Sequence, residues 1–160
     1  MNVIVQDIPA LRAAAVRNVG PYPTVCKAFE KLHAWFEGHP DVCGPETLWF
    51  AAFHDCPKTT PPERCRADAC ISLSPGYPVG DGVEEKVFAG GRFATYLVSV
   101  PPEIGDELSK RWCELAGWVA ERNLALNDPA RPCFEIYYNY GPVSPMRKWV
   151  VDLCIPVKPE

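Results

Sequence analysis

The stretch that decides the fold is LSKRWCELAGWV, residues 108–119. Its large apolar side chains recur at i, i+4, i+7 and i+11, at Leu108, Trp112, Leu115 and Val119. This spacing is typical of an amphipathic helix with one buried face. An earlier stretch, VCKAFEKLHAWF at residues 25–36, has the same spacing at Val25, Phe29, Leu32 and Phe36. Each of these positions precedes its counterpart by the same interval, here called the helix offset, which indicates an internal repeat.

The strand-forming runs around the two helices repeat in the same way. Asp68-Ala69-Cys70-Ile71 precedes Asp152-Leu153-Cys154-Ile155 by an interval only one position longer than the helix offset, here called the strand offset. One candidate strand comes before each helix and two follow it, at 11–19, 49–54, 67–73, 92–100, 133–140 and 149–157. The sequence therefore predicts a single α+β domain over 1–160, built from two β-α-β-β repeats at about 3–82 and 83–158. Antiparallel sheets with a helix on each would leave a central ligand cleft near a pseudo-twofold axis.

Charge and hydropathy narrow the classes of partner. The net charge of -4 and the pI near 5.4 argue against direct nucleic-acid binding, which needs a basic surface, and favour cationic small molecules. No uncharged run is long enough to span a membrane, and the N-terminus lacks the pattern of a signal peptide. We expect a cytoplasmic protein without a membrane partner.

The eight cysteines form no Cys-x-x-Cys framework, so most are expected to be reduced, buried, small apolar residues. A zinc site made from His54, Cys56, Cys65 and Cys70 would have no common ligand spacing, and no metal is predicted. No cofactor is predicted either, because the glycine pairs of the chain match neither a dinucleotide fingerprint nor a phosphate loop.

Glu135 is the residue most difficult to explain as part of a plain strand. In the run at 133–140, alternation places Glu135, Tyr137 and Asn139 on one face. The opposite face, with Phe134, Ile136 and Tyr138, is predicted to pack beneath the helices. Glutamate is depleted in strands, so a carboxylate here needs a compensating partner.

The repeat makes Glu135 stand out further. The strand offset maps Glu135 onto Ala51, so the acid occurs in one copy only. A single carboxylate among Trp49, Phe53 and Tyr137 could bind a lipophilic cation, since aromatic faces and the charge attract the same ligand. Burial would raise the pKa of Glu135, and a bound cation would lower it again. The alternative is that Glu135 faces solvent or pairs with a structural Arg or Lys, and that the aromatic residues are core.

The run Arg131-Pro132-Cys133-Phe134-Glu135-Ile136-Tyr137, with Asn139 and Gly141 after it, resembles the signature strand of the GyrI-like family, also called SbmC or DNA gyrase inhibitory proteins. Other landmarks occur in that family's order, at Val19-Gly20-Pro21-Tyr22, Trp49, Asp55, Pro75-Gly76-Tyr77 and Gly90-Gly91. The resemblance implies duplicated SHS2-like modules, as in the effector-binding domains of AraC/MerR-type multidrug regulators. It also implies an aromatic cleft in which a strand glutamate, here Glu135, meets cationic hydrophobic compounds.

The predicted function is that of a stand-alone protein that binds or sequesters such compounds. The predicted ligand-binding residues are Glu135, Tyr137, Trp49, Phe53 and Tyr22. Two alternatives follow from the resemblance. One is a hydrolase of reactive cyclopropane-type toxins, with Glu135 as general base and Tyr137 as proton donor or positioning group. The other is a DNA gyrase inhibitor that acts by protein contact.

Overall fold

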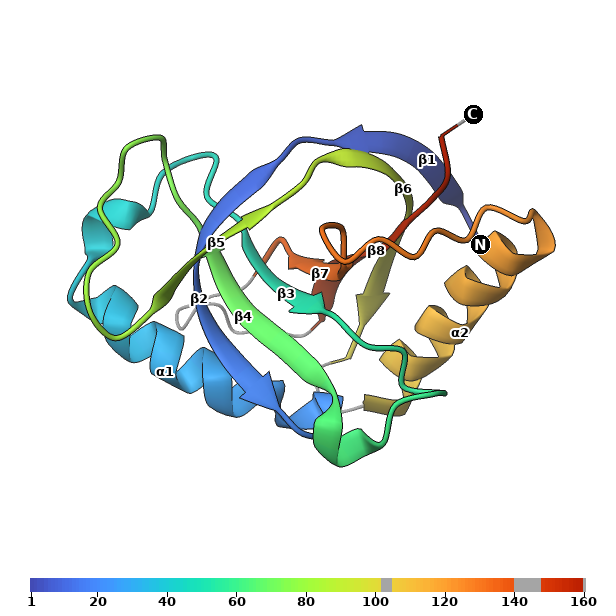
Figure 1. Ribbon diagram of the computed structural model, residues 1–160, viewed down its shortest axis with the longest axis horizontal. Helices are drawn as coiled ribbons and strands as arrows, with labels where there is room; N and C mark the ends of the chain where they lie inside the picture. Colours follow the sequence, from blue (N-terminus) through green and yellow to red (C-terminus); the bar gives the residue numbers. More distant parts are fainter. Residues whose placement is uncertain (102–104, 140–147, 160) are drawn as a thin grey trace. The chain divides into compact units, whose positions relative to one another are not determined.

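The computed structural model describes residues 1–101, 105–139 and 148–159 (Figure 1). The chain forms two compact units: unit 1 contains Met1–Pro9 and Ala89–Glu160, and unit 2 contains Ala10–Phe88. Within the described residues, each unit has four antiparallel strands and one long helix, which confirms the predicted α+β class with antiparallel sheets. Among the described helices, none is both long and apolar enough to cross a membrane.

In unit 2 the strands follow the order β3-β4-β2-β5. They are β2 (Leu11–Val19), β3 (Trp49–Phe53), β4 (Arg66–Ser72) and β5 (Glu84–Phe88). Helix α1 (Cys26–Glu37) packs on β2 and β4 through Ala28, Phe29, Leu32 and Trp35, which are buried. It ends at Glu37, and Gly38 is its C-cap. Three short 3-10 helices occupy Tyr22–Val25, Pro40–Val42 and Pro62–Arg64.

Unit 1 has the equivalent order, β7-β8-β6-β1. Its strands are β1 (Val3–Ile8), β6 (Gly91–Val100), β7 (Cys133–Tyr137) and β8 (Trp149–Pro156). Helix α2 (Gly105–Glu121) packs on β6 and β8. The acidic residues in its first turn stabilise the helix, because their charge interacts favourably with the positive end of the helix dipole. The core of the unit consists of Ala94, Tyr96, Val98, Val100, Leu115, Val119, Val151, Leu153 and Val157.

Strands β1 and β5 were not predicted from the sequence, so each repeat is β-β-α-β-β rather than β-α-β-β. Each of these first strands pairs with the second strand of the other repeat: β1 pairs with β6, and β5 pairs with β2. Both have mostly exposed or half-buried side chains, and β5 is the polar sequence EEKVF. Charged residues are typical of strands at the end of a sheet, and they conceal the usual apolar alternation.

The prediction for the two faces of β7 was wrong. Tyr137 packs against the core beneath α2, and Glu135 is hydrogen-bonded to a side chain of that helix, so this face is turned toward α2. Phe134 lies on the opposite face, where its ring is 5.5 Å from that of Phe93. Both Phe134 and Ile136 are buried although they lie on the face of β7 opposite to α2. Because both faces of the strand are buried, polarity does not reveal which one the helix covers.

The expectation that most cysteines are buried was also wrong. Cys65, Cys70 and Cys154 are buried and Cys133 is half-buried, whereas Cys26, Cys43, Cys56 and Cys113 are exposed. Cys26 and Cys113 belong to α1 and α2 and lie outside the apolar stripes of those helices. Cys70 and Cys154, inside β4 and β8, are buried as predicted, because a thiol there packs as a small apolar group.

Candidate functional site

Glu135 on β7 is the centre of a small polar cluster inside unit 1. Its side chain is buried, with 7 % of the residue exposed. The indole Nε1–H of Trp112 donates to Oε1 at 2.6 Å, and the hydroxyl of Tyr137 donates to Oε2 at 2.5 Å. We call Glu135, Trp112 and Tyr137 the Glu135 cluster. It joins one residue of α2 to two residues on the same face of β7.

The carboxylate of Glu135 has hydrogen-bond donors but forms no ion pair with any residue that the structure describes. Burial raises the pKa of Glu135 above its ordinary value of 4.5, and the hydrogen bonds from Trp112 and Tyr137 oppose that shift. A buried carboxylate without a countercharge is costly and favours either a proton or a cation. Glu135 therefore does not face solvent, and among the described residues it has no structural ion pair with Arg or Lys.

Aromatic side chains lie in the cluster and in the core beside it within unit 1. Trp112 and Tyr137 are half-buried and pack against the core, as do Trp118 and Trp149. The ring centroids of Tyr137 and Trp149 are 6.2 Å apart in an edge-to-face arrangement. The sequence interpretation assigned Trp112 to the core and did not connect it with Glu135. Its indole N–H was the available signal, because a buried Trp usually has a hydrogen-bond acceptor.

The other predicted ligand-binding residues belong to unit 2. Trp49 stacks on His33 of α1 with centroids 4.9 Å apart, and meets Phe36 edge-on at 5.3 Å. Phe53 meets Tyr22 edge-on at 4.7 Å. These contacts join β3 to α1 and to the short helix before it. The prediction that Trp49, Phe53 and Tyr22 share one cleft with Glu135 stays a prediction.

The two repeats carry different chemistry at the position of the Glu135 cluster. Glu135 and Tyr137 correspond to Ala51 and Phe53 at the strand offset, and Trp112 corresponds to Phe29 at the helix offset. Ala51 and Phe29 are fully or nearly fully buried, so unit 2 fills the same place with apolar groups alone. The fold of a unit therefore does not require a carboxylate, an indole N–H and a phenol here.

Comparison with known proteins identifies the family. Residues 1–158 match the model of the GyrI-like small molecule binding domain. The chain belongs to the GyrI-like family. Two relatives of this GyrI-like protein are DNA gyrase inhibitor 1 of Dickeya dadantii and the DNA gyrase inhibitor of Escherichia coli K12, each 31% identical. The first comparison covers 99% of this chain and 100% of the relative, and the second covers 100% and 99%.

Solved structures of low sequence identity share the GyrI-like fold. The C-terminal domain of EcmrR has a TM-score of 0.75 at 17% identity, over 98% of this chain and 97% of that one. The structure of SAV2435 bound to tetraphenylphosphonium has a TM-score of 0.67 at 10% identity, over 99% and 94%. The family resemblance predicted from the strand at 133–137 is thus confirmed.

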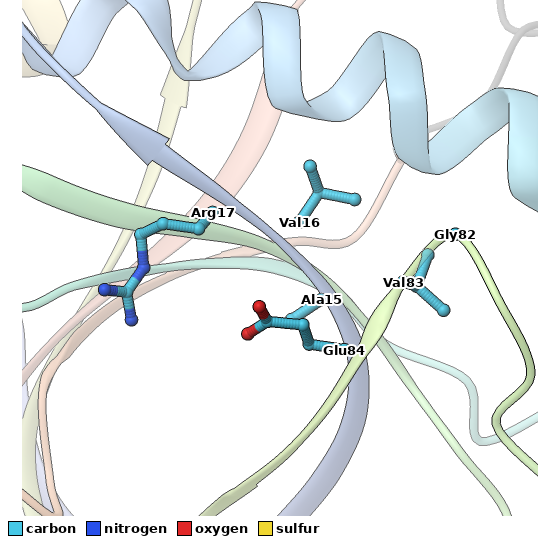
Figure 2. Close-up of a pocket in the computed structure, with 6 residues that line it drawn as sticks. All are labelled: Ala15, Val16, Arg17, Gly82, Val83 and Glu84. Carbon is cyan, nitrogen blue, oxygen red and sulfur yellow. The ribbon is translucent and has the colours of Figure 1, made fainter.

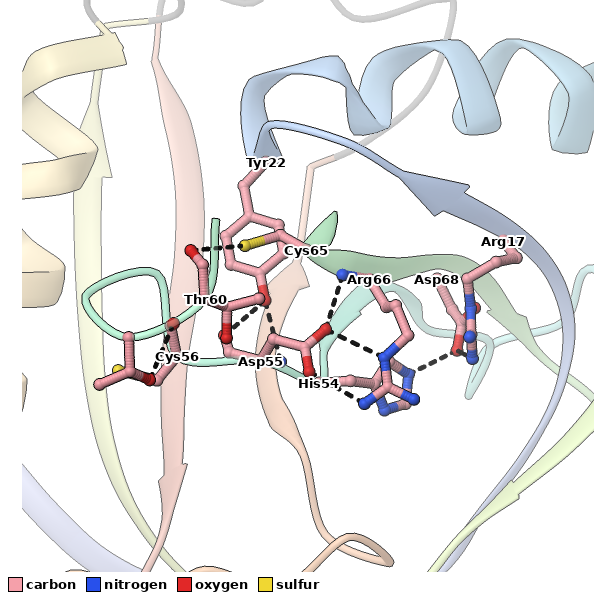
Figure 3. A network of polar contacts seen from close by, with 10 residues as sticks. Arg17, Tyr22, His54, Asp55, Cys56, Thr60, Cys65, Arg66 and Asp68 are labelled. Atoms are coloured by element: carbon pink, nitrogen blue, oxygen red, sulfur yellow. Dashed lines mark hydrogen bonds and ion pairs between the residues drawn. The ribbon is translucent and has the colours of Figure 1, made fainter. Parts of the chain in front are cut away.

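A second polar network lies in unit 2 of this GyrI-like protein, around β4 (Figure 3). His54 contacts Asp68 at 2.6 Å rather than its sequence neighbour Asp55, which pairs with Arg66 at 2.9 Å. Burial of Asp68 acts to raise its pKa, but hydrogen bonds from His54 and Arg17 outweigh it, so the pKa lies below its ordinary range. His54 and Asp55 thus belong to two separate pairs, one with Asp68 and one with Arg66.

A pocket of about 410 Å³ lies in unit 2, and Figure 2 shows the residues around it. It is lined by Ala15, Val16, Arg17, Gly82, Val83 and Glu84. None of these side chains is aromatic, and Arg17 already pairs with Asp68. The pocket therefore offers little stacking surface to an apolar ligand and does not contain the Glu135 cluster.

Proposed function

We propose that this GyrI-like protein binds hydrophobic, cationic small molecules and that Glu135 recognises the cation. The observation that carries the proposal is a buried carboxylate with aromatic neighbours and no cationic partner in the described part of the chain. A lipophilic cation would supply the missing charge. The ring faces of the neighbouring Trp and Tyr residues would add about 0.5–2 kcal/mol of cation–π attraction each where the contact is desolvated.

The family and the repeat support this proposal independently. The matching model describes a small molecule binding domain, and the solved relative SAV2435 holds tetraphenylphosphonium, a lipophilic cation. Within the chain, unit 2 has apolar residues at the positions that correspond to the Glu135 cluster. This difference indicates that the glutamate is not needed for the stability of the fold. A role in ligand recognition explains why the costly carboxylate is present in one repeat only.

Thermal unfolding with tetraphenylphosphonium tests the proposal. At a concentration 100 times the dissociation constant, a ligand that binds only the folded state stabilises it by about 2.7 kcal/mol. We expect a saturable rise in Tm for the wild type. For Glu135→Gln, the apparent affinity obtained from the Tm shifts should be lower by about tenfold or more, since the cation loses its countercharge. Neutral triphenylphosphine oxide should produce a much smaller shift with both proteins.

Glu121→Gln is the matched control, because it removes one negative charge at the exposed end of α2. It should respond to tetraphenylphosphonium as the wild type does. Equal shifts for wild type, Glu135→Gln and Glu121→Gln would remove Glu135 from the binding site. Equal shifts for the cation and the neutral phosphine oxide would show that charge is not recognised.

We propose inhibition of DNA gyrase as the second candidate function. Its specific support is the name of relatives 31% identical to this chain over nearly its whole length. With a net charge of -4, the protein would act on the enzyme by protein contact and not by occupying DNA. A supercoiling assay with the purified chain should show dose-dependent loss of supercoiled product. No inhibition at a large molar excess over gyrase would exclude this function.

A further inference from the structure

Asp68 and Asp152 occupy the same place in the two repeats but have different partners. Asp68 on β4 is fully buried and accepts hydrogen bonds from two basic side chains (Figure 3). Arg17 donates from Nε to Oδ1 at 2.5 Å and from a terminal nitrogen to Oδ2 at 3.2 Å. His54 Nε2 lies 2.6 Å from Oδ2. Each carboxylate oxygen of Asp68 is therefore satisfied.

Among the residues that the structure describes, Asp152 on β8 has no arginine partner like that of Asp68. It is buried, with 8 % of the residue exposed. Oδ2 accepts a hydrogen bond from the hydroxyl of Tyr138 at 3.2 Å, whereas Oδ1 is buried and has no hydrogen-bond partner in the described part of the chain. Burial raises the pKa of Asp152 above its ordinary value. One half of this carboxylate is thus left without a donor.

The strand register explains why Asp152 has no partner equivalent to Arg17 among the described residues. Arg17 lies opposite Asp68 across the β2–β4 pair, and Leu97 lies opposite Asp152 across the β6–β8 pair. Tyr138 corresponds to His54 at the strand offset and takes the place of the imidazole. The second repeat therefore keeps the acid, replaces the imidazole by a phenol, and has an apolar side chain where the first repeat has a guanidinium.

Two exposed side chains lie beside Asp152. Leu97, which is opposite it on β6, is 59 % exposed, and Tyr138, which donates to it, is 54 % exposed. In unit 2 the side chain of Arg17 is 31% exposed and still reaches the fully buried Asp68. A guanidinium that approaches from the solvent side can therefore satisfy an aspartate in this position.

We propose that Asp152 is a second ligand site, which binds the guanidinium or amidinium group of a small molecule in the place that Arg17 occupies at Asp68. A planar cation of this kind supplies two N–H donors to one carboxylate. Leu97 and the ring of Tyr138 offer an apolar surface to the rest of the molecule. This site is separate from the Glu135 cluster, because Asp152 is paired with Ile136, which lies on the face of β7 opposite to Glu135.

Titration with benzamidine by isothermal calorimetry tests the proposal on the full chain. We expect saturable binding to the wild type and an affinity lower by about tenfold or more in Asp152→Asn, since the charge partner is lost. Glu135→Gln should retain the Asp152-dependent binding of benzamidine while it loses binding of tetraphenylphosphonium. The two sites can therefore fail separately.

Leu97→Arg provides a test that does not depend on removing the acid. This substitution restores the arginine of the other repeat, so it should raise Tm and abolish benzamidine binding at Asp152. Leu97→Gln is the control of similar length without charge, and it should do neither. Equal benzamidine affinity in the wild type, Asp152→Asn and Leu97→Arg would overturn the proposal. Loss of benzamidine binding in Glu135→Gln, with binding kept in Asp152→Asn and Leu97→Arg, would also overturn it.

Discussion

Glu135 is a carboxylate whose ionisation opposes folding. Its pKa in the folded protein is raised above the ordinary value of 4.5, chiefly by burial. Between these two pKa values the folded state holds a proton that the unfolded state has released. The slope of the free energy of unfolding against pH is proportional to the number of protons bound by the unfolded state minus the number bound by the folded state. This difference is negative here, so stability decreases as pH rises. The contribution is fully present below pH 4.5, is lost as pH rises through the folded-state pKa, and is constant above it.

A pH series with Glu135→Gln measures this effect. The amide cannot ionise, so the free energy of unfolding of the wild type, relative to Glu135→Gln, should fall as pH rises from about 4.5. Urea denaturation at several pH values gives the difference in the free energy of unfolding between the two proteins. Glu121→Gln is the control, because its free energy of unfolding relative to the wild type should not fall with pH in this way. A gap between wild type and Glu135→Gln that does not change with pH would show that Glu135 keeps an ordinary pKa in the folded state.

At the scale of single elements, local patterns predicted what local interactions determine. The apolar stripes correctly placed α1 and α2, since helical periodicity is encoded within a few residues. Strands β1 and β5 were missed because their stability comes from pairing with β6 and β2, which are distant in the sequence. Such pairing leaves little trace in a polar run like EEKVF.

The candidate site also has one part that local sequence predicted and one part that depends on tertiary contacts. Glu135 was predicted because a lone acid in an apolar strand conflicts with the local pattern. Its contact with Trp112 depends on which face of β7 the helix α2 covers, and both faces of that strand are buried. The apolar counterpart at Ala51, Phe29 and Phe53 was visible in the sequence, but it became informative only once Trp112 and Tyr137 were seen to donate to the same carboxylate.

At the scale of the whole molecule, the compact units do not coincide with the sequence repeats. Each unit has the same strand order, and in each the terminal strand comes from the other repeat. β1 completes the sheet of unit 1, although all of unit 2, Ala10–Phe88, separates it in the sequence from the rest of that unit. Covalent neighbours within a repeat are therefore not always structural neighbours, and the two repeats are linked by exchanged strands as well as by the chain.

Removal of residues 2–9 tests this exchange by hydrogen–deuterium exchange. Without β1, β6 loses its pairing partner along Val3–Ile8, and Val3 and Val5 no longer cover the core beneath α2. We expect amides of β6 and α2 to exchange about tenfold faster or more, because their opening free energy falls with the lost contacts. Ile4→Ser is the control, since Ile4 is 53 % exposed and the pairing of β1 remains. If the greatest loss of protection fell instead on β2, β3 and β4, β1 would belong with its own sequence repeat and the strand exchange would be wrong.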